Sequence, residues 1–271
     1  MMNAMMNAIE NFPFVLPNTT WQYVVATLQL LMIATNATNE IHNPSPYSKF
    51  ATINKQAVQK AIPSKYGMLI AYVPATLISL YKTKTETTVT LASSLVLIHF
   101  FKRVVETLFV HKYSGSMDCN TSIAIGTFYS LVSLLIIGTA QPTSQHWLQL
   151  QRLGLRLFVV GQIGNLYHHY LLRQLRSSPK NEKKDDDSNK RTYIAPTGGL
   201  FNLVACPHYL FEIVGFLGIA FASLHLHALF AACGMTSFLC GRAINTLKFY
   251  QATFTEEEWP RERKALVPFV F

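Results

Sequence analysis

The chain has 271 residues, enough for one large domain or two small ones. Half of the residues are hydrophobic and only 14% are charged, against about 25% in soluble domains. This apolar content excludes disorder for most of the chain, and four cysteines without CxxC spacing exclude a disulfide scaffold. The net charge of +9 raises the question of nucleic acid, which the positions of the basic residues answer.

Seven apolar segments follow one another along the chain. They occupy residues 21–35, 66–81, 89–109, 121–140, 150–172, 209–224 and 226–249. Most approach the roughly 20 residues that a helix needs to cross a bilayer, although the shorter ones also suit buried helices of a soluble protein. Only helices or closed barrels cross lipid, and ten-residue alternating strands are absent from the sequence. We therefore predict an all-α integral membrane bundle of about seven transmembrane helices, forming a single membrane domain over residues 1–271.

Basic residues gather in alternate connectors between these segments. If all seven segments span the membrane, one side holds fifteen lysines and arginines, and the other holds only Lys82 and Lys84. Cytoplasmic loops carry such an excess. The pattern predicts a multi-pass protein with a lumenal amino terminus and a cytosolic carboxyl terminus. It also explains the net charge without nucleic acid as a partner.

Polar side chains interrupt the apolar segments, and charged groups inside a bilayer are costly unless they face a cavity. His99, Arg103 and Glu106 are spaced i, i+4, i+7 and share one helix face. Lys102 and Glu106 form an i, i+4 pair of opposite charge. The alternative is that Lys102 and Arg103 only extend their charged ends to the membrane surface. Further polar positions are Tyr72 on the second segment, Asn165, His168, His169, Arg173 and Arg176 on or after the fifth, Glu212 on the sixth, and Arg242, Asn245, Lys248 and Tyr250 on or after the last.

The residue pattern favours neither a metal centre nor a Rossmann nucleotide site. Close histidine pairs occur only at His168–His169 and at His225 and His227, and no cysteine spacing suits zinc. No GxGxxG motif follows a strand. We predict no metal, while arginines in a cytosolic cavity remain able to hold a nucleotide phosphate through forked contacts.

Three segments resemble the steroid 5α-reductase family. They are residues 192–201 (TYIAPTGGLF), 206–212 (CPHYLFE) and 264–271 (KALVPFVF). The resemblance covers residues 89–271 and is strongest over residues 160–271. Residues 99–114 (HFFKRVVETLFVHKYS) are similar to the trans-2-enoyl-CoA reductases, a sister group.

Both groups are seven-helix reductases, mostly of the endoplasmic reticulum membrane, that use NADPH on a carbon–carbon double bond conjugated to a carbonyl. The resemblance therefore implies NADPH as cofactor and a hydrophobic enone as substrate. A 3-oxo-4-ene steroid is the first expectation, a very-long-chain 2-enoyl-CoA is the alternative, and a polyprenal stays open. Hydride attack on the β-carbon places negative charge on the carbonyl oxygen, which hydrogen-bond donors stabilise.

The resemblance also assigns cofactor residues. The positions that hold NADPH in the steroid enzymes are occupied here by Asn165, Arg176, Tyr193, Glu212, Arg242 and Tyr250. His208 and His169 stand where those enzymes have Asn and Asp. We expect all eight residues to line a cytosolic cofactor site.

The groups that meet the substrate differ from the family pattern. A Glu and a Tyr contact the ketone in the steroid enzymes, and their positions hold Tyr72 and Phe100 here. Tyr72 or His99 is then the candidate donor. Tyr209 and Glu106 fit the residues that matter in the enoyl-CoA group, although Tyr209 also suits an interfacial aromatic anchor.

Two other functions stay open. Membrane methyltransferases of related architecture carry Arg-His-Pro-x-Tyr where residues 206–209 read CPHY, and that changed order argues against them. The other is a non-catalytic lipid-binding protein, which would bind no NADPH.

Overall fold

The structure is a computed structural model, and its described residues form seven α-helices. It describes residues 12–48, 50, 60–113, 115–143, 145–176 and 193–271. The helices are α2 (Thr20–His42), α4 (Ser64–Thr85), α5 (Leu91–Val105), α6 (Cys119–Thr139), α7 (Leu148–Leu175), α8 (Pro207–Ser223) and α9 (Leu226–Thr253). Each predicted apolar segment coincides with one of them, so the all-α prediction is confirmed.

Short elements complete the described chain. The π-helix η2 (Glu106–Val110) continues α5, and the 3₁₀-helix η4 (Gly199–Asn202) precedes α8. Strands β1 (Ala61–Pro63) and β2 (Ser116–Asp118) pair antiparallel, with Ile62 opposite Met117. This small ribbon joins the start of α4 to the start of α6.

The helix ends follow from local sequence. The side chains of Thr90 and Asp118 each accept the backbone N–H three residues on, which caps α5 and α6. Pro207 opens α8, where its missing N–H costs nothing. Leu224 ends α8 in the left-handed region, with φ of 53°. This last conformation is unusual for a branched side chain and turns the chain into α9.

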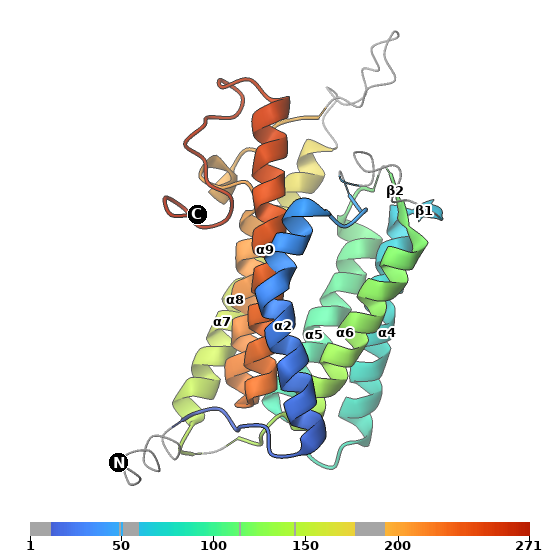
Figure 1. The fold of residues 1–271 in the computed structure, drawn as a ribbon, viewed down its shortest axis with the longest axis vertical. Helices are drawn as coiled ribbons and strands as arrows, with labels where there is room; N and C mark the ends of the chain where they lie inside the picture. Colours follow the sequence, from blue (N-terminus) through green and yellow to red (C-terminus); the bar gives the residue numbers. More distant parts are fainter. Residues whose placement is uncertain (1–11, 49, 51–59, 114, 144, 177–192) are drawn as a thin grey trace.

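The helices form two groups that lie side by side (Figure 1). Helices α4, α5 and α6 form one group, and α2, α7, α8 and α9 form the other. Contacts of α5 with α7 and α8, and of α6 with α8 and α9, join the two groups. Polar side chains on the surfaces where α5 and α6 contact the second group therefore lie inside the molecule.

The tail after α9 folds back against the start of α8. The Ala205 N–H donates to the Lys264 carbonyl at 2.8 Å, and the Cys206 N–H donates to that of Ala265 at 3.1 Å. Trp259, which belongs to this tail, is fully buried and packs against Tyr250 of α9. Two segments that carry the family resemblance, residues 206–212 and 264–271, therefore lie in contact at the end of the bundle that carries the carboxyl terminus (Figure 1).

Helices α7 and α8 approach each other through glycines. A Cβ atom on Gly161 would lie 2.5 Å from the Gly215 nitrogen, and one on Gly154 would lie 2.7 Å from the Gly218 carbonyl oxygen. Both neighbours are backbone atoms, which cannot rotate away. Small residues at such positions allow close packing of membrane helices.

Replacing Gly161 with alanine is expected to lower the free energy of unfolding by about 1–3 kcal/mol, because the two helices must separate. Gly138→Ala is the matched control, since a Cβ there meets nothing within 4 Å. Unfolding of the purified variants in detergent measures both changes. Equal stability of the two variants would show that the α7–α8 contact tolerates a methyl group.

Two helices, α6 and α9, are long and apolar enough to cross a membrane. Helix α8 is apolar but has only 17 residues, and α7 carries several basic and histidine side chains that lower its hydropathy. The described helices therefore do not reach the predicted number of seven spans by this criterion, and the seven-span topology stays a prediction.

His225 caps α9 in a way that depends on its charge. Its Nδ1 accepts the His227 N–H at 3.2 Å, which requires an unprotonated Nδ1. Burial and the neighbouring His227 lower the pKa of His225 to about 4. An unfolded histidine has a pKa of about 6.5, so the unfolded chain binds the extra proton first as the pH falls.

Acidification should therefore destabilise the fold. Between about pH 6.5 and pH 4, His225 is expected to lower the free energy of unfolding by up to about 1.4 kcal/mol per pH unit. His225→Asn keeps a capping side chain without the titration, so its unfolding should show a shallower pH dependence. Parallel pH profiles for the two proteins would contradict this role of His225.

Candidate functional site

A buried polar cluster lies where the two helix groups meet. It combines Tyr72 of α4, Arg103 of α5 and Glu106 of η2 with Asn165 and His169 of α7. Each of these residues is at most 7% exposed. Burial of several charges in one place requires pairing, and the contacts show how it is achieved.

Glu106 is the centre of this cluster. Its Oε1 lies 2.9 Å from Lys102 Nζ, and its Oε2 lies 2.8 Å from Arg103 Nη1. His169 Nδ1 lies 3.3 Å from Glu106 Oε1 and also 3.3 Å from Arg103 Nη1. The predicted Lys102–Glu106 pair is confirmed, and Arg103 is buried instead of extending to the membrane surface.

A π-helical turn begins at Glu106. The His111 N–H donates to the Glu106 carbonyl five residues earlier, at 2.8 Å. The turn brings the His111 ring to 4.6 Å from that of His169. Burial, with the nearby His169 and Arg103, lowers the pKa of His111 to about 2, so this ring is neutral. Such turns are rare and often occur at functional sites.

Tyr72 presents a phenol with a free proton. Arg103 Nη2 donates to the Tyr72 hydroxyl oxygen at 2.7 Å, and the Tyr129 ring stacks on Tyr72 with centroids 5.7 Å apart. A guanidinium can only donate, so the Tyr72 O–H points elsewhere. Within the described residues no acceptor for this O–H is seen. The phenol is therefore fixed in place with its donor available.

Asn165 connects three helices. Its Oδ1 accepts from Lys102 Nζ at 2.7 Å, and its Nδ2 donates to the His208 carbonyl at 2.9 Å. The His208 ring lies 5.4 Å from that of His169 and 4.2 Å from that of Tyr209. The predicted residues Asn165, His169 and His208 thus belong to one cluster with Glu106.

Glu212 projects from α8 and is 7% exposed. Its charge acts on Tyr72, Arg103 and Tyr209. Among the residues that the structure describes, no side chain donates a hydrogen bond to it. A buried carboxylate between two arginine clusters, without a donor of its own, is suited to accept N–H groups of a ligand.

Arg242 forms a second buried cluster beside the first. Its Nη1 donates to Glu40 Oε1 at 2.5 Å, and its Nη2 donates to the Tyr47 carbonyl at 3.0 Å. The guanidinium lies 3.5 Å from the centre of the Tyr47 ring. Arg242, which the sequence predicts as a cofactor residue, thus joins α9 to the end of α2.

The remaining predicted residues lie around these two clusters. His99 is buried against Phe216, and its Nδ1 lies 3.3 Å from Gln162 Nε2. It is not one of the residues that pair with Glu106, which are Lys102, Arg103 and His169. Arg176 is exposed and donates to the Lys112 carbonyl. Tyr193 and Tyr250 lie at the carboxyl-terminal end of α9. The Tyr193 ring is edge-on to Phe249, and the Tyr250 ring packs against Trp259.

The donor atoms of Glu106, His111 and His169 lie within 4.8 Å of one another. Such a group has the composition of a metal site. Both oxygens of Glu106, however, already bond cationic groups, Lys102 and Arg103. A metal ion there would meet two positive charges, so the cluster fits a charge-compensated polar site better than a metal site.

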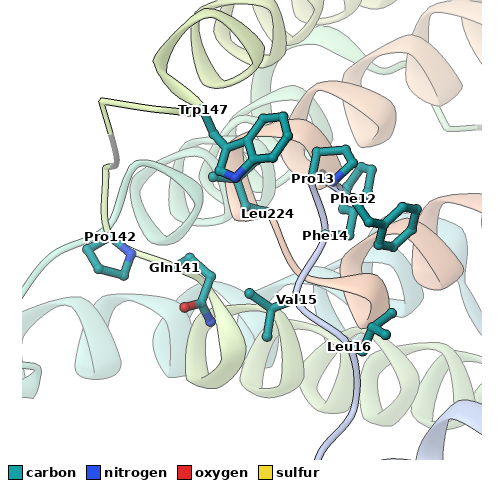
Figure 2. A pocket seen from close by; sticks show the side chains of 9 residues that line it. All are labelled: Phe12, Pro13, Phe14, Val15, Leu16, Gln141, Pro142, Trp147 and Leu224. Atoms are coloured by element: carbon teal, nitrogen blue, oxygen red, sulfur yellow. The ribbon is translucent and has the colours of Figure 1, made fainter. Parts of the chain in front are cut away.

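A cavity of about 450 Å³ lies beside the turn between α8 and α9, and Figure 2 shows the residues that line it. Here Val15 forms backbone hydrogen bonds to Leu224 and Leu226 at the α8–α9 turn. The lining residues are Phe12, Pro13, Phe14, Val15, Leu16, Gln141, Pro142, Trp147 and Leu224. Gln141 and Trp147 are the lining residues with polar side-chain atoms, and no ionisable side chain stands among the lining residues.

A sequence model of the 3-oxo-5-alpha-steroid 4-dehydrogenase family matches residues 116–271, which is more than half of the chain. The chain belongs to this family. Asn165, His208, Glu212 and Arg242 lie within the matched region. Tyr72, Arg103 and Glu106 precede it.

Relatives of three kinds are similar to the chain. The 3-oxo-5-alpha-steroid 4-dehydrogenase 2 of Macaca fascicularis is 39% identical over 119 residues, 44% of this chain and 42% of the relative. The very-long-chain enoyl-CoA reductase of Dictyostelium discoideum is 29% identical over 182 residues, which are 64% of this chain and 55% of the relative. The polyprenal reductase of Caenorhabditis elegans is 29% identical over 198 residues, which are 69% of this chain and 62% of the relative. The matched part spans roughly half the length of these relatives.

Sequence reasoning missed the acidic partner of Arg242. Glu40 lies in the last two turns of α2, after the predicted segment ends at residue 35. A single acidic residue among neutral polar ones gave no pattern that points to α9. Tyr47 was missed for the same reason, because its role depends on a contact between residues that are 195 positions apart.

Proposed function

We propose that the protein is an integral membrane reductase that uses NADPH to reduce the carbon–carbon double bond of a hydrophobic α,β-unsaturated carbonyl compound. The observation that carries the proposal is Tyr72, a buried phenol fixed by Arg103 with its own proton free. It lies in a polar cluster inside a protein of the 3-oxo-5-alpha-steroid 4-dehydrogenase family. Such a donor is what the developing charge on a carbonyl oxygen requires.

The residues present fit a nicotinamide cofactor. A carboxamide offers N–H donors, and the buried Glu212 carboxylate is an acceptor without a side-chain donor among the described residues. Asn165 and His208 lie on the facing helix surfaces. Arg176, exposed at the end of α7, is suited to a phosphate. When bound, the reduced nicotinamide supplies the hydride, and the protein supplies position and charge stabilisation.

A 3-oxo-4-ene steroid is the first substrate that we propose. The family match and the 39% identical relative both carry a steroid name. A second candidate is a long 2-enoyl-CoA, favoured by the Lys102–Glu106 pair at 2.9 Å, which lies in the segment that resembles the enoyl-CoA reductases.

The deciding experiment incubates membranes containing the protein with NADPH and three substrates: a steroid enone, a long 2-enoyl-CoA and a polyprenal. Reduction of the steroid enone supports the first candidate, and selective reduction of the enoyl-CoA or the polyprenal replaces it. Protection from unfolding by S-adenosylmethionine but not by NADPH would indicate a methyltransferase instead. No reduction and no protection by NADPH would indicate a non-catalytic lipid-binding protein.

We also propose that all seven α-helices cross the endoplasmic reticulum membrane, with a lumenal amino terminus and a cytosolic carboxyl terminus. Large apolar side chains are exposed along helices that fail the span criterion, among them Leu28 and Leu31 on α2, and Val160 and Ile163 on α7. Apolar exposure of this extent is rare on monomeric soluble proteins. Labelling of single cysteines placed in each connector, from either side of sealed microsomes, tests the topology.

A further inference from the structure

Among the described residues, Arg103 links the Tyr72 phenol to the buried Glu106 carboxylate. Its Nη2 donates to the Tyr72 oxygen at 2.7 Å and its Nη1 donates to Glu106 Oε2 at 2.8 Å. Its guanidinium carbon also lies 4.9 Å from the centre of the Tyr72 ring. At 7% exposure, Arg103 has little access to water.

We infer that Arg103 is the positioning residue of the reaction: it directs the Tyr72 proton toward the substrate and compensates the charge left on the Tyr72 oxygen. The inference rests on the proposed function and adds to it a residue with no role in the resemblance described above. Because the guanidinium fills one acceptor position of the phenol, the O–H is left for another acceptor.

The step balances as follows. Hydride from the reduced nicotinamide adds to the β-carbon, and the electron pair of the double bond moves onto the carbonyl oxygen. The Tyr72 O–H bond breaks and its proton joins that oxygen, giving an enol, which rearranges to the saturated ketone without a net change in protons. The phenolate of Tyr72, paired with Arg103, regains a proton from water.

Glu106 fixes the geometry of Arg103. Without Glu106, the guanidinium would be free to turn toward other acceptors. With it, the guanidinium uses two separate nitrogens, Nη1 for Glu106 and Nη2 for Tyr72, in a fixed planar geometry. Arg103→Lys keeps the charge but replaces these two nitrogens by one on a flexible stem, so the planar geometry that aims a donor at the Tyr72 oxygen is lost.

A double-mutant cycle tests the inference. Arg103→Lys is expected to lower kcat on the order of 10²-fold in the native background, with KM for NADPH little changed. In a Tyr72→Phe background the same change should lower kcat less than about 3-fold, because Arg103 acts through the Tyr72 oxygen. Single-turnover rates in membranes give the four values.

The outcomes separate the inference from the proposed function. If Arg103→Lys lowers kcat equally in both backgrounds, Arg103 has only a structural role and the inference is wrong, while enone reduction stands. If the native protein reduces no substrate of the panel, the proposed function itself fails. Should Arg103→Lys not fold, Arg103→Gln runs the same cycle, since it keeps an N–H donor without the charge.

Discussion

Replacing Tyr72 with phenylalanine is expected to lower kcat for enone reduction by about 10²–10⁴-fold, the range for loss of a positioned proton donor. The change removes one oxygen and keeps the ring, so stacking on Tyr129 at 5.7 Å is preserved. The affinity for NADPH should stay within about 3-fold, because the Tyr72 oxygen accepts its hydrogen bond from Arg103 and not from a residue proposed to hold the cofactor.

Tyr209→Phe is the matched comparison, since Tyr209 is the other phenol that is a candidate proton donor, and its ring lies 4.2 Å from that of His208. If Tyr72 is the donor, Tyr209→Phe should have the smaller effect on kcat. The reverse order would move the donor role to Tyr209, as the likeness to the enoyl-CoA reductases suggests. If neither substitution lowers turnover, both assignments are wrong.

Glu40→Gln is expected to lower the free energy of unfolding by about 3–5 kcal/mol. Both Glu40 and Arg242 are almost fully buried, and the substitution leaves the guanidinium as an uncompensated charge inside the protein. Denaturant unfolding of the detergent-solubilised protein measures the loss.

The same substitution at Glu86 is its control. Glu86 pairs with Lys82 at 2.6 Å, but the side chain is 39% exposed and water already screens the pair. Glu86→Gln should change stability by less than about 1 kcal/mol. Losses of similar size at the two positions would mean that the Glu40–Arg242 pair is solvated in the native protein.

The positions of the helices could be predicted because they depend on local composition. Seven apolar runs gave seven helices, and the i, i+4 spacing of Lys102 and Glu106 gave an ion pair that the structure confirms. Within one helix, sequence spacing fixes which side chains are neighbours.

Contacts between helices could not be predicted in this way. The Arg103–Tyr72 and Arg242–Glu40 bonds join residues 31 and 202 positions apart, and no periodicity links them. The seven-span topology stays a prediction, because α7 carries polar groups that belong to the cluster and lower its hydropathy.

The π-helical turn at Glu106 makes the length of the chain critical at this point. Its hydrogen bond spans five residues, from Glu106 to His111, whereas the bond of a regular α-helix spans four. Each residue of a helix rotates the chain by about 100°. A one-residue deletion within 106–110 would thus regularise the backbone and swing His111 away from His169. Family members that keep both histidines at the positions of His111 and His169 should therefore have no insertion or deletion within residues 106–110.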